Sequence, residues 1–410
     1  MHYIKKIAIL ISVRGLSLIG FFLLAFAMDG NSFKEYTLYF STWQIISQIT
    51  GLQLGSTLFR YGATPNFHKE AFYISKILAQ ATPIVFVIFL LSAVGNTPPI
   101  VTCIGMSLIY ALFSCTVEFA RASTSENKIF ALQSIIGLSY LSIFIISQTL
   151  NNKIKFNTVI IVEGAAHFIV TILIFWKIKN NQPETPRTSE KNIFKKLIPL
   201  WKTTSLPLIP NNIIWYIYFN SPQIISYFIQ SEISEHNNRS ILFRLIVASS
   251  TLSSILSIGL QKGLVNLYED NMTAYEKKKY RVLKIDLPLT FITLLIYTQL
   301  VNKVYLWLKT EPTELYIYVS SYITSISTLT TIFLAIYVTS NFILSEKKMI
   351  IATKSMLLGL PVYILFLLIT LKHLPVESSI IYGLTASLSV TLFARYFYLL
   401  TRRNKIEKRP

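Results

Sequence analysis

The sequence has little charge and very little cysteine. Only 14% of its 410 residues are charged, whereas 52% are hydrophobic, and a soluble domain of this size needs far more charge on its surface. The two cysteines, Cys103 and Cys115, lie in one apolar run and suggest neither a disulfide framework nor a metal site. We therefore expect a protein surrounded by lipid, without a metal or cofactor.

Acidic residues and soluble-enzyme motifs are also scarce. The chain has 38 Lys and Arg but 19 Asp and Glu, which gives a net charge of +19. The basic residues stand in short segments between apolar runs, so membrane topology explains them better than nucleic-acid binding. The sequence contains no P-loop, G-x-S-x-G elbow, H-E-x-x-H motif or dinucleotide fingerprint. Without a P-loop, any transport by this chain must be powered by ions, by substrate gradients or by a downstream pull.

Long apolar runs dominate the chain. Each has roughly 20 residues, the length at which an α-helix crosses ~30 Å of hydrocarbon. Strands of a membrane barrel would instead show ~10-residue segments of alternating polarity. The pattern predicts an all-α integral membrane protein with about 12 transmembrane helices, six on each side of a central linker. The predicted spans are 7–27, 36–56, 71–94, 98–119, 129–148, 157–176, 203–230, 240–260, 287–308, 315–340, 350–371 and 377–400.

The basic residues gather on alternate segments between these spans. One set of segments, which includes both termini, holds 30 of the 38 Lys and Arg, and positive residues in short loops stay cytoplasmic. The prediction is a multi-pass membrane protein with both termini in the cytoplasm. A polar cytoplasmic linker at 181–202 divides an N-terminal lobe, 1–180, from a C-terminal lobe, 203–410. A faint repeat, GLQLG at 51–55 and GLQKG at 259–263, supports a duplication.

Three arginines lie within or at the ends of predicted spans. Arg14 lies in the first helix, Arg60 ends the second, and Arg244 begins the eighth. Several guanidinium groups facing one cavity would bind a phosphate or pyrophosphate, because the planar group matches two phosphate oxygens. The alternative is that each side chain extends along the lipid to the nearest interface.

One carboxylate and one imidazole share a helix face near mid-membrane. Glu163 and His167 stand one turn apart on the sixth span. Such a pair could exchange a proton and couple transport to an ion gradient. The alternative is a polar pair that only stabilises helix packing.

The seventh span is rich in proline and asparagine. Pro207, Pro210 and Pro222 would each remove a backbone hydrogen bond, and broken backbone in a membrane is tolerated where it lines a cavity or packs in protein. Aromatic residues on the same span would suit a sugar path. The alternative is an ordinary kinked helix.

Four segments resemble the polysaccharide repeat-unit (O-antigen, Wzx-type) flippases of the MOP (multidrug/oligosaccharidyl-lipid/polysaccharide) exporter superfamily. They are Asp29–Tyr36, Gly51–Gly55, Leu58–Tyr61 and Leu206–Pro210, the last followed by a polar aromatic helix. The resemblance covers nearly the whole chain in length and topology. It implies two six-helix lobes around a cation-lined cavity.

The resemblance also implies a function. It suggests a flippase that moves an undecaprenyl-pyrophosphate-linked oligosaccharide from the cytoplasmic to the periplasmic leaflet by alternating access. Arginines on helices 1, 2 and 8 hold the pyrophosphate in the related lipid II flippases, which implies this role for Arg14, Arg60 and Arg244. The expected partners are this substrate, membrane lipids and other membrane proteins of polysaccharide assembly.

Two other functions remain open for such a chain. A cation-coupled exporter of small molecules shares the superfamily fold and would be expected to depend on carboxylates within the membrane more than on arginines. A polysaccharide polymerase or ligase would be expected to carry large periplasmic loops, and every predicted outside loop here is short.

Overall fold

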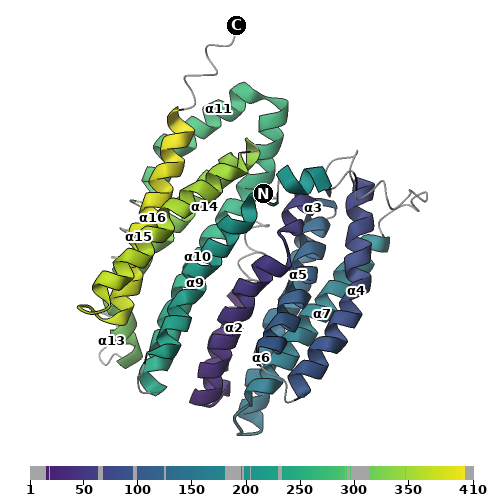
Figure 1. Cartoon of the computed structure of the whole chain (residues 1–410), viewed down its shortest axis with the longest axis vertical. Helices are drawn as coiled ribbons and strands as arrows, with labels where there is room; N and C mark the ends of the chain where they lie inside the picture. Colours follow the sequence, from purple (N-terminus) through teal and green to yellow (C-terminus); the bar gives the residue numbers. More distant parts are fainter. Residues whose placement is uncertain are drawn as a thin grey trace. The chain divides into compact units, whose positions relative to one another are not determined.

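The computed structural model of the chain is a bundle of α-helices (Figure 1). It describes residues 15–17, 19–62, 68–95, 99–123, 126–180, 195, 198–203, 205–229, 233–290, 292, 296, 314–346 and 348–401. Within these ranges, seven helices are long and apolar enough to cross a membrane. The predicted all-α, multi-pass membrane fold is confirmed.

The chain forms two compact units, Met1–Asn237 and Asn238–Pro410. The helix that follows the linker, α9 (Leu208–Phe228), packs against α2 (Gly30–Thr50) and therefore belongs to the first unit. The boundary between the two compact units thus lies after α9 and not at the linker 181–202. The lobe boundary expected from the sequence duplication stays a prediction.

The first unit is organised around α5, which packs against α2, α3, α4 and α7. Its large aromatic residues are buried between these helices, with Trp43 at 1% exposure and Phe89 at 0%. Gly164 allows the closest approach, because a Cβ there would lie 2.2 Å from the Phe89 ring. The other helices of this unit are α3 (Leu54–Gly62), α4 (His68–Val94), α5 (Pro99–Ser123), α6 (Glu126–Thr149) and α7 (Phe156–Asn180).

The predicted second span is broken in the structure. Helix α2 begins at Asp29, whose Oδ1 accepts a hydrogen bond from the Ser32 amide at 2.9 Å, and it ends at Thr50. Leu52 and Gln53 then take left-handed backbone angles, with φ of 44° and 51°, before α3 begins. Such angles cost of order 1–3 kcal/mol each for residues other than glycine, and they persist where surrounding contacts hold them.

The second unit contains the related motif without a break. GLQKG at 259–263 lies inside α10 (Ile233–Asp270), a continuous helix much longer than the predicted span 240–260. The repeated motif therefore has different conformations in the two halves. Most of the predicted span 287–308 lies outside the described residues.

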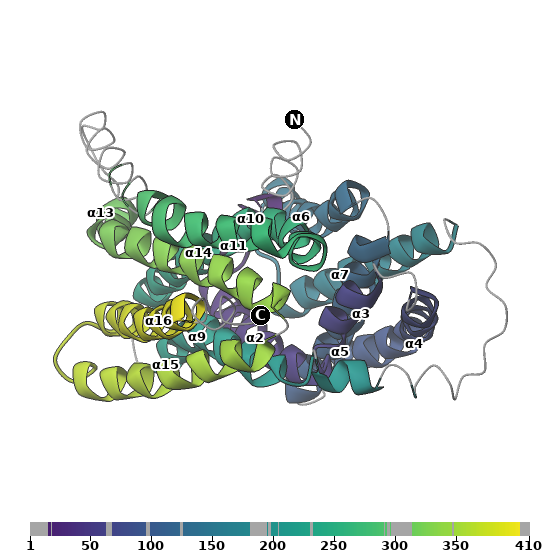
Figure 2. The same cartoon turned by 90° about the horizontal axis from the view of Figure 1, so that it is seen from above.

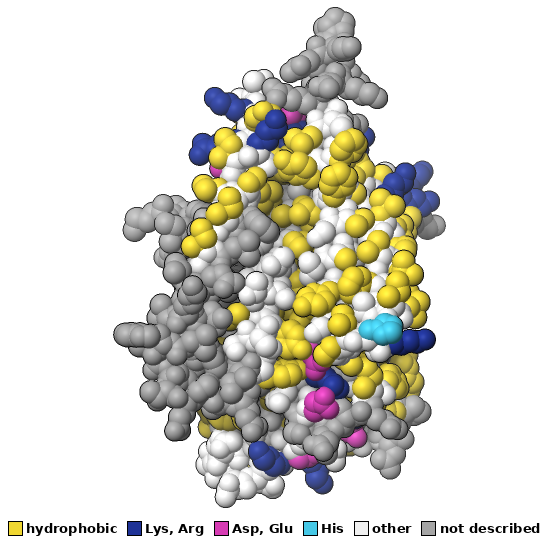
Figure 3. Space-filling model, turned by 90° about the vertical axis from the view of Figure 1, so that its left-hand side faces the viewer, with side chains coloured by type: hydrophobic (Ala, Val, Ile, Leu, Met, Phe, Trp, Pro, Cys, Tyr) yellow, Lys and Arg dark blue, Asp and Glu magenta, His cyan; other side chains and the backbone are white. Residues whose placement is uncertain are grey.

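Helices α14, α15 and α16 carry the core of the second unit. Helix α16 packs against both α14 and α15, and Figure 2 shows α15 and α16 side by side. Leucines of α15 are exposed toward the surroundings of the bundle, and Figure 3 shows a broad apolar surface with Lys and Arg mostly toward its two ends. This is the surface expected of a bundle in lipid. The elements of this unit are α10, α11 (Met272–Arg281), π-helix η1 (Val282–Asp286), α13 (Glu314–Ser321), α14 (Ile323–Ser345), α15 (Met349–Thr370) and α16 (Val376–Thr401).

The prolines of the seventh predicted span lie mostly at its start. Pro207 is the N-cap residue of α9 and Pro210 lies in its first turn, where proline removes no helical hydrogen bond. Only Pro222 lies inside, and the helix continues through it to Phe228. Residues 208–228 form one continuous helix, so of the two alternatives for this span the structure favours the helix over a broken backbone.

Candidate functional site

The carboxylate of Glu163 is fully buried inside the first unit. It lies on α7 at 0% exposure and accepts hydrogen bonds from two phenols: Tyr140 of α6, with O–O 2.7 Å, and Tyr36 of α2, with O–O 3.3 Å. A buried carboxylate is tolerated when hydrogen bonds replace its hydration. Three helices therefore converge on one ionisable group.

His167 lies one turn further along α7 and is 4% exposed. Its Nδ1 is 2.9 Å from the main-chain oxygen of Glu163. Its ring is surrounded by three aromatic side chains, Trp43, Tyr110 and Phe113, with centroid distances of 6.4, 5.7 and 5.0 Å. The two residues share a face and a buried site, as their spacing suggests, and their role in ion coupling stays a prediction.

Of the three arginines predicted to share a phosphate site, the structure describes the side chain of Arg244 alone. Arg14 lies outside the described residues, and Arg60 lies on α3 with its side chain outside them. Arg244 lies on α10 and is 3% exposed. An arginine that extends to the interface keeps its guanidinium group in water, so this burial argues against that alternative for Arg244. The shared phosphate site stays a prediction.

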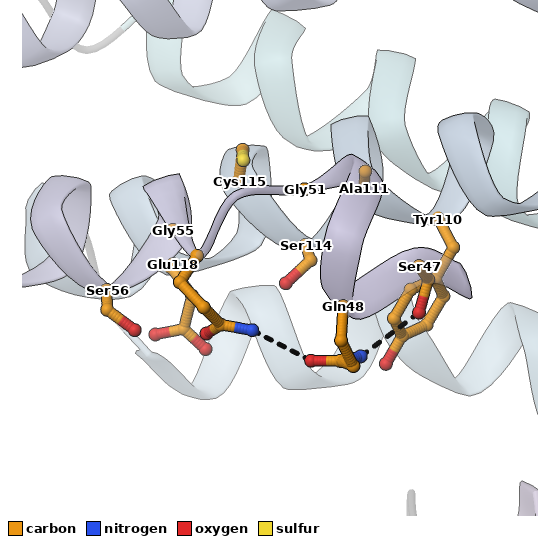
Figure 4. A pocket seen from close by; sticks show the side chains of 11 residues that line it. Ser47, Gln48, Gly51, Gly55, Ser56, Tyr110, Ala111, Ser114, Cys115 and Glu118 are labelled. Atoms are coloured by element: carbon orange, nitrogen blue, oxygen red, sulfur yellow. Dashed lines mark hydrogen bonds between the residues drawn. The ribbon is translucent and has the colours of Figure 1, made fainter. Parts of the chain in front are cut away.

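A polar pocket opens where α2 breaks (Figure 4). Its volume is about 470 Å³, part of it open to solvent. Gln53 donates to the Gln48 Oε1 at 2.8 Å, and Gln48 donates to the Ser47 Oγ at 3.0 Å, so the amides form a chain along one wall. The lining suits a ligand rich in hydroxyl groups. It consists of Ser47, Gln48, Gly51, Gln53, Gly55, Ser56, Tyr110, Ala111, Ser114, Cys115 and Glu118.

The segment that precedes α9 holds this break in place. Trp201 donates from Nε1 to the Leu52 carbonyl at 2.9 Å, and Ser205 donates from Oγ to the Gln53 carbonyl at 2.6 Å. Both left-handed residues thus have their carbonyl groups satisfied from a segment about 150 residues away. These contacts explain how two strained residues persist.

An ion pair on α5 borders the pocket. Glu118 accepts two hydrogen bonds from Nη1 of Arg121, at 2.7 and 2.8 Å. The guanidinium group also lies over the Phe59 ring, 4.9 Å from its centroid.

Sequence reasoning missed two buried ionic groups in the second unit. Arg239 donates from Nε to Glu377 at 2.7 Å, and the same carboxylate oxygen accepts from the Tyr318 hydroxyl at 2.7 Å. Lys279 pairs with Glu346 at 2.9 Å. The partners lie 138 and 67 residues apart, so spacing along one helix carries no signal for them.

Neither a protein-family model nor a curated protein matches this sequence. Solved structures are similar over nearly the whole chain. MATE in its straight conformation has a TM-score of 0.66 at 14% identity, with 99% of this chain and 95% of that chain covered. A MOP superfamily transporter from Pyrococcus furiosus has a TM-score of 0.64 at 14% identity with the same coverage.

A eukaryotic MATE transporter, AtDTX14, is similar at a TM-score of 0.55 and 13% identity, with 97% of this chain and 96% of that chain covered. These neighbours are transporters rather than enzymes, in line with the expectation from the sequence. At such identities the likeness shows the fold, and the Wzx-type assignment stays a prediction. The chain has the fold of the MATE transporters of the MOP superfamily.

Proposed function

We propose that this chain is a cation-coupled transporter that moves its substrate across the membrane by alternating access. Glu163 carries the proposal. Its carboxylate lies within the membrane-spanning part of one unit and is held by hydroxyl groups from two further helices. Gain or loss of a proton there changes the hydrogen bonds of three helices at once, which is how a local charge change can select between two packings.

Export of a small molecule is the substrate class that the structural neighbours support best. One of them is a multidrug resistance MATE family transporter in an outward-facing conformation, and another is an inward-facing form.

The exporter proposal predicts drug efflux. Overproduction of the chain in a strain without its own efflux pumps should raise resistance to cationic drugs, and dissipation of the proton gradient should remove the effect. The measurement is accumulation of a fluorescent cation in intact cells. Unchanged accumulation at confirmed membrane levels of the protein would exclude this substrate class.

The second substrate class is an undecaprenyl-pyrophosphate-linked oligosaccharide. The buried Arg244, the excess of basic residues and the resemblance to the flippases support it. The reverse polarity of the binding pocket in the solved MOP transporter from Pyrococcus furiosus suggests a different function for that protein, so the fold does not by itself select the small-molecule class. On this proposal the protein lies in a bacterial inner membrane with both termini cytoplasmic and meets other proteins of polysaccharide assembly.

The flippase proposal predicts a charge requirement at Arg14. Arg14→Ala should abolish surface polysaccharide in the native host, whereas Arg14→Lys should retain part of it, because lysine keeps the charge but not the two parallel hydrogen bonds. Polysaccharide is measured on gels of cell-surface extracts, with the protein level measured in parallel. Normal polysaccharide with Arg14→Ala at normal protein level would contradict the proposal.

A further inference from the structure

Helix α11 has one face buried against the second unit. Tyr275, Lys279 and Leu283 follow one another at helical spacing across α11 and η1, and all are buried. The Tyr275 hydroxyl donates to the Phe342 carbonyl at 3.2 Å, and Lys279 donates to Glu346 at 2.9 Å. The buried surroundings also raise the pKa of Tyr275 above its usual range. These contacts fix the rotation of α11 about its own axis.

The opposite face presents three cations. Lys277, Arg281 and Lys284 are exposed at positions i, i+4 and i+7, which places them in one line; we call them the basic stripe. Lys284 Nζ lies 4.5 Å from the centroid of the Tyr280 ring. Asp286 is the carboxylate beside the stripe, with Oδ1 3.6 Å from Nε of Arg281. The Arg281 side chain is 74% exposed and that of Asp286 is 45% exposed.

The chain passes from exposed cations to exposed apolar side chains directly after the basic stripe. Ile285 is 57% exposed, Leu289 is 62% exposed and Ile292 is 54% exposed. Such a sequence of side chains along one helix marks the boundary between lipid headgroups and hydrocarbon.

The position of α11 in its unit agrees with this boundary. Its partner Glu346 directly follows α14, and α15 begins at Met349, so α11 lies where two spans meet the membrane surface. Figure 1 shows α11 turning away from the end of α10 beside the ends of α14 and α16.

We propose that the basic stripe binds the headgroups of anionic phospholipids. Three exposed cations in a line complement phosphate groups at a membrane surface, the tyrosine beside Lys284 suits the headgroup level, and the following apolar side chains receive the acyl chains. The buried face keeps the stripe turned outward, so the lipid meets a preformed surface. This inference does not depend on which substrate the protein carries.

The test uses the full chain in nanodiscs that contain phosphatidylcholine with a small fraction of phosphatidylglycerol. Native mass spectrometry of the released protein measures the phosphatidylglycerol that it retains. Lys277→Gln, Arg281→Gln or Lys284→Gln should each weaken retention by about fivefold, and the triple variant should retain no more than it retains phosphatidylcholine. Asp286→Asn should act in the opposite direction and strengthen retention, because it removes the competing carboxylate.

Lys372→Gln is the matched control. Lys372 is an exposed cation just after the other end of α15, so its loss should leave retention unchanged. Equal retention by the triple variant and the unaltered chain would overturn the proposal. So would displacement of the lipid by soluble glycerophosphoglycerol at the same concentration, because the apolar side chains would then contribute nothing. Thermal unfolding in phosphatidylcholine alone checks that each variant is folded, and the single variants decide the question if the triple variant is not.

Discussion

Glu163→Gln is expected to reduce proton-driven transport by at least about tenfold, because an amide cannot take up and release the proton. Glutamine has nearly the same shape. One phenol can still donate to its carbonyl oxygen and the other can accept from its amide nitrogen, so the bundle should fold. The measurement is substrate uptake into inverted vesicles after a pH jump, together with substrate binding in the absence of a gradient. Binding should persist while the driven uptake is lost.

Two further variants separate coupling from structure. Tyr140→Phe keeps the ionisable carboxylate but removes its 2.7 Å hydrogen bond. Driven uptake should therefore persist in part, whereas Glu163→Gln should lose it. Glu35→Gln, an exposed carboxylate on α2, is the control and should transport normally. Normal driven uptake with Glu163→Gln would refute coupling through this site.

Arg395→Ala is expected to cause the largest loss of stability. Arg395 is 2% exposed on α16 and reaches both neighbouring helices. Its Nε donates to Ser355 at 2.8 Å and its Nη2 to the Ala352 carbonyl at 3.3 Å, both on α15. Its Nη1 donates to Ser340 and to the Ile336 carbonyl on α14.

Truncation at this position removes these buried hydrogen bonds between α16 and its two neighbours and opens a cavity. We expect Arg395→Ala to lower the free energy of unfolding by about 3–5 kcal/mol. Arg395→Met fills the space without burying a charge and should cost less than about 2 kcal/mol. Unfolding by sodium dodecyl sulfate in mixed micelles gives both values.

An exposed cation on a neighbouring helix provides the control for Arg395. Lys354→Ala on α15 should stay within about 0.5 kcal/mol of the unaltered protein. An Arg395→Ala protein as stable as the Lys354→Ala protein would show that this arginine does not join the three helices.

The fold class was predictable because the signals for membrane helices are local. A run of about 20 apolar residues has one stable conformation in lipid, whatever lies elsewhere in the chain. The spans on α4, α5, α6 and α7 accordingly agree with their predicted positions to within a few residues. The shared helix face of Glu163 and His167 was predictable for the same reason, since residues four apart on a helix are neighbours.

The errors arose where distant contacts override local preference. GLQLG at 51–55 and GLQKG at 259–263 are nearly identical, yet one breaks its helix and the other lies within a continuous one. Hydrogen bonds from Trp201 and Ser205 stabilise the break in the first copy. Nothing within the motif itself predicts these distant contacts. The prolines of the seventh span suggested a broken backbone for a different reason. Pro207 and Pro210 lie at the start of α9, where proline is favourable, and their presence therefore does not break the helix.

Composition and hydrophobic pattern by themselves determined that this chain is a multi-pass helical membrane protein, because burial of backbone polar groups in lipid leaves no other choice for such runs. Only the tertiary structure decided which charged groups are buried and what they contact. Glu163 meets two phenols from other helices, and Arg239 meets Glu377 from 138 residues away. The physical reason is that desolvation of a charge is offset by partners brought together by helix packing, and packing joins residues that the sequence keeps far apart.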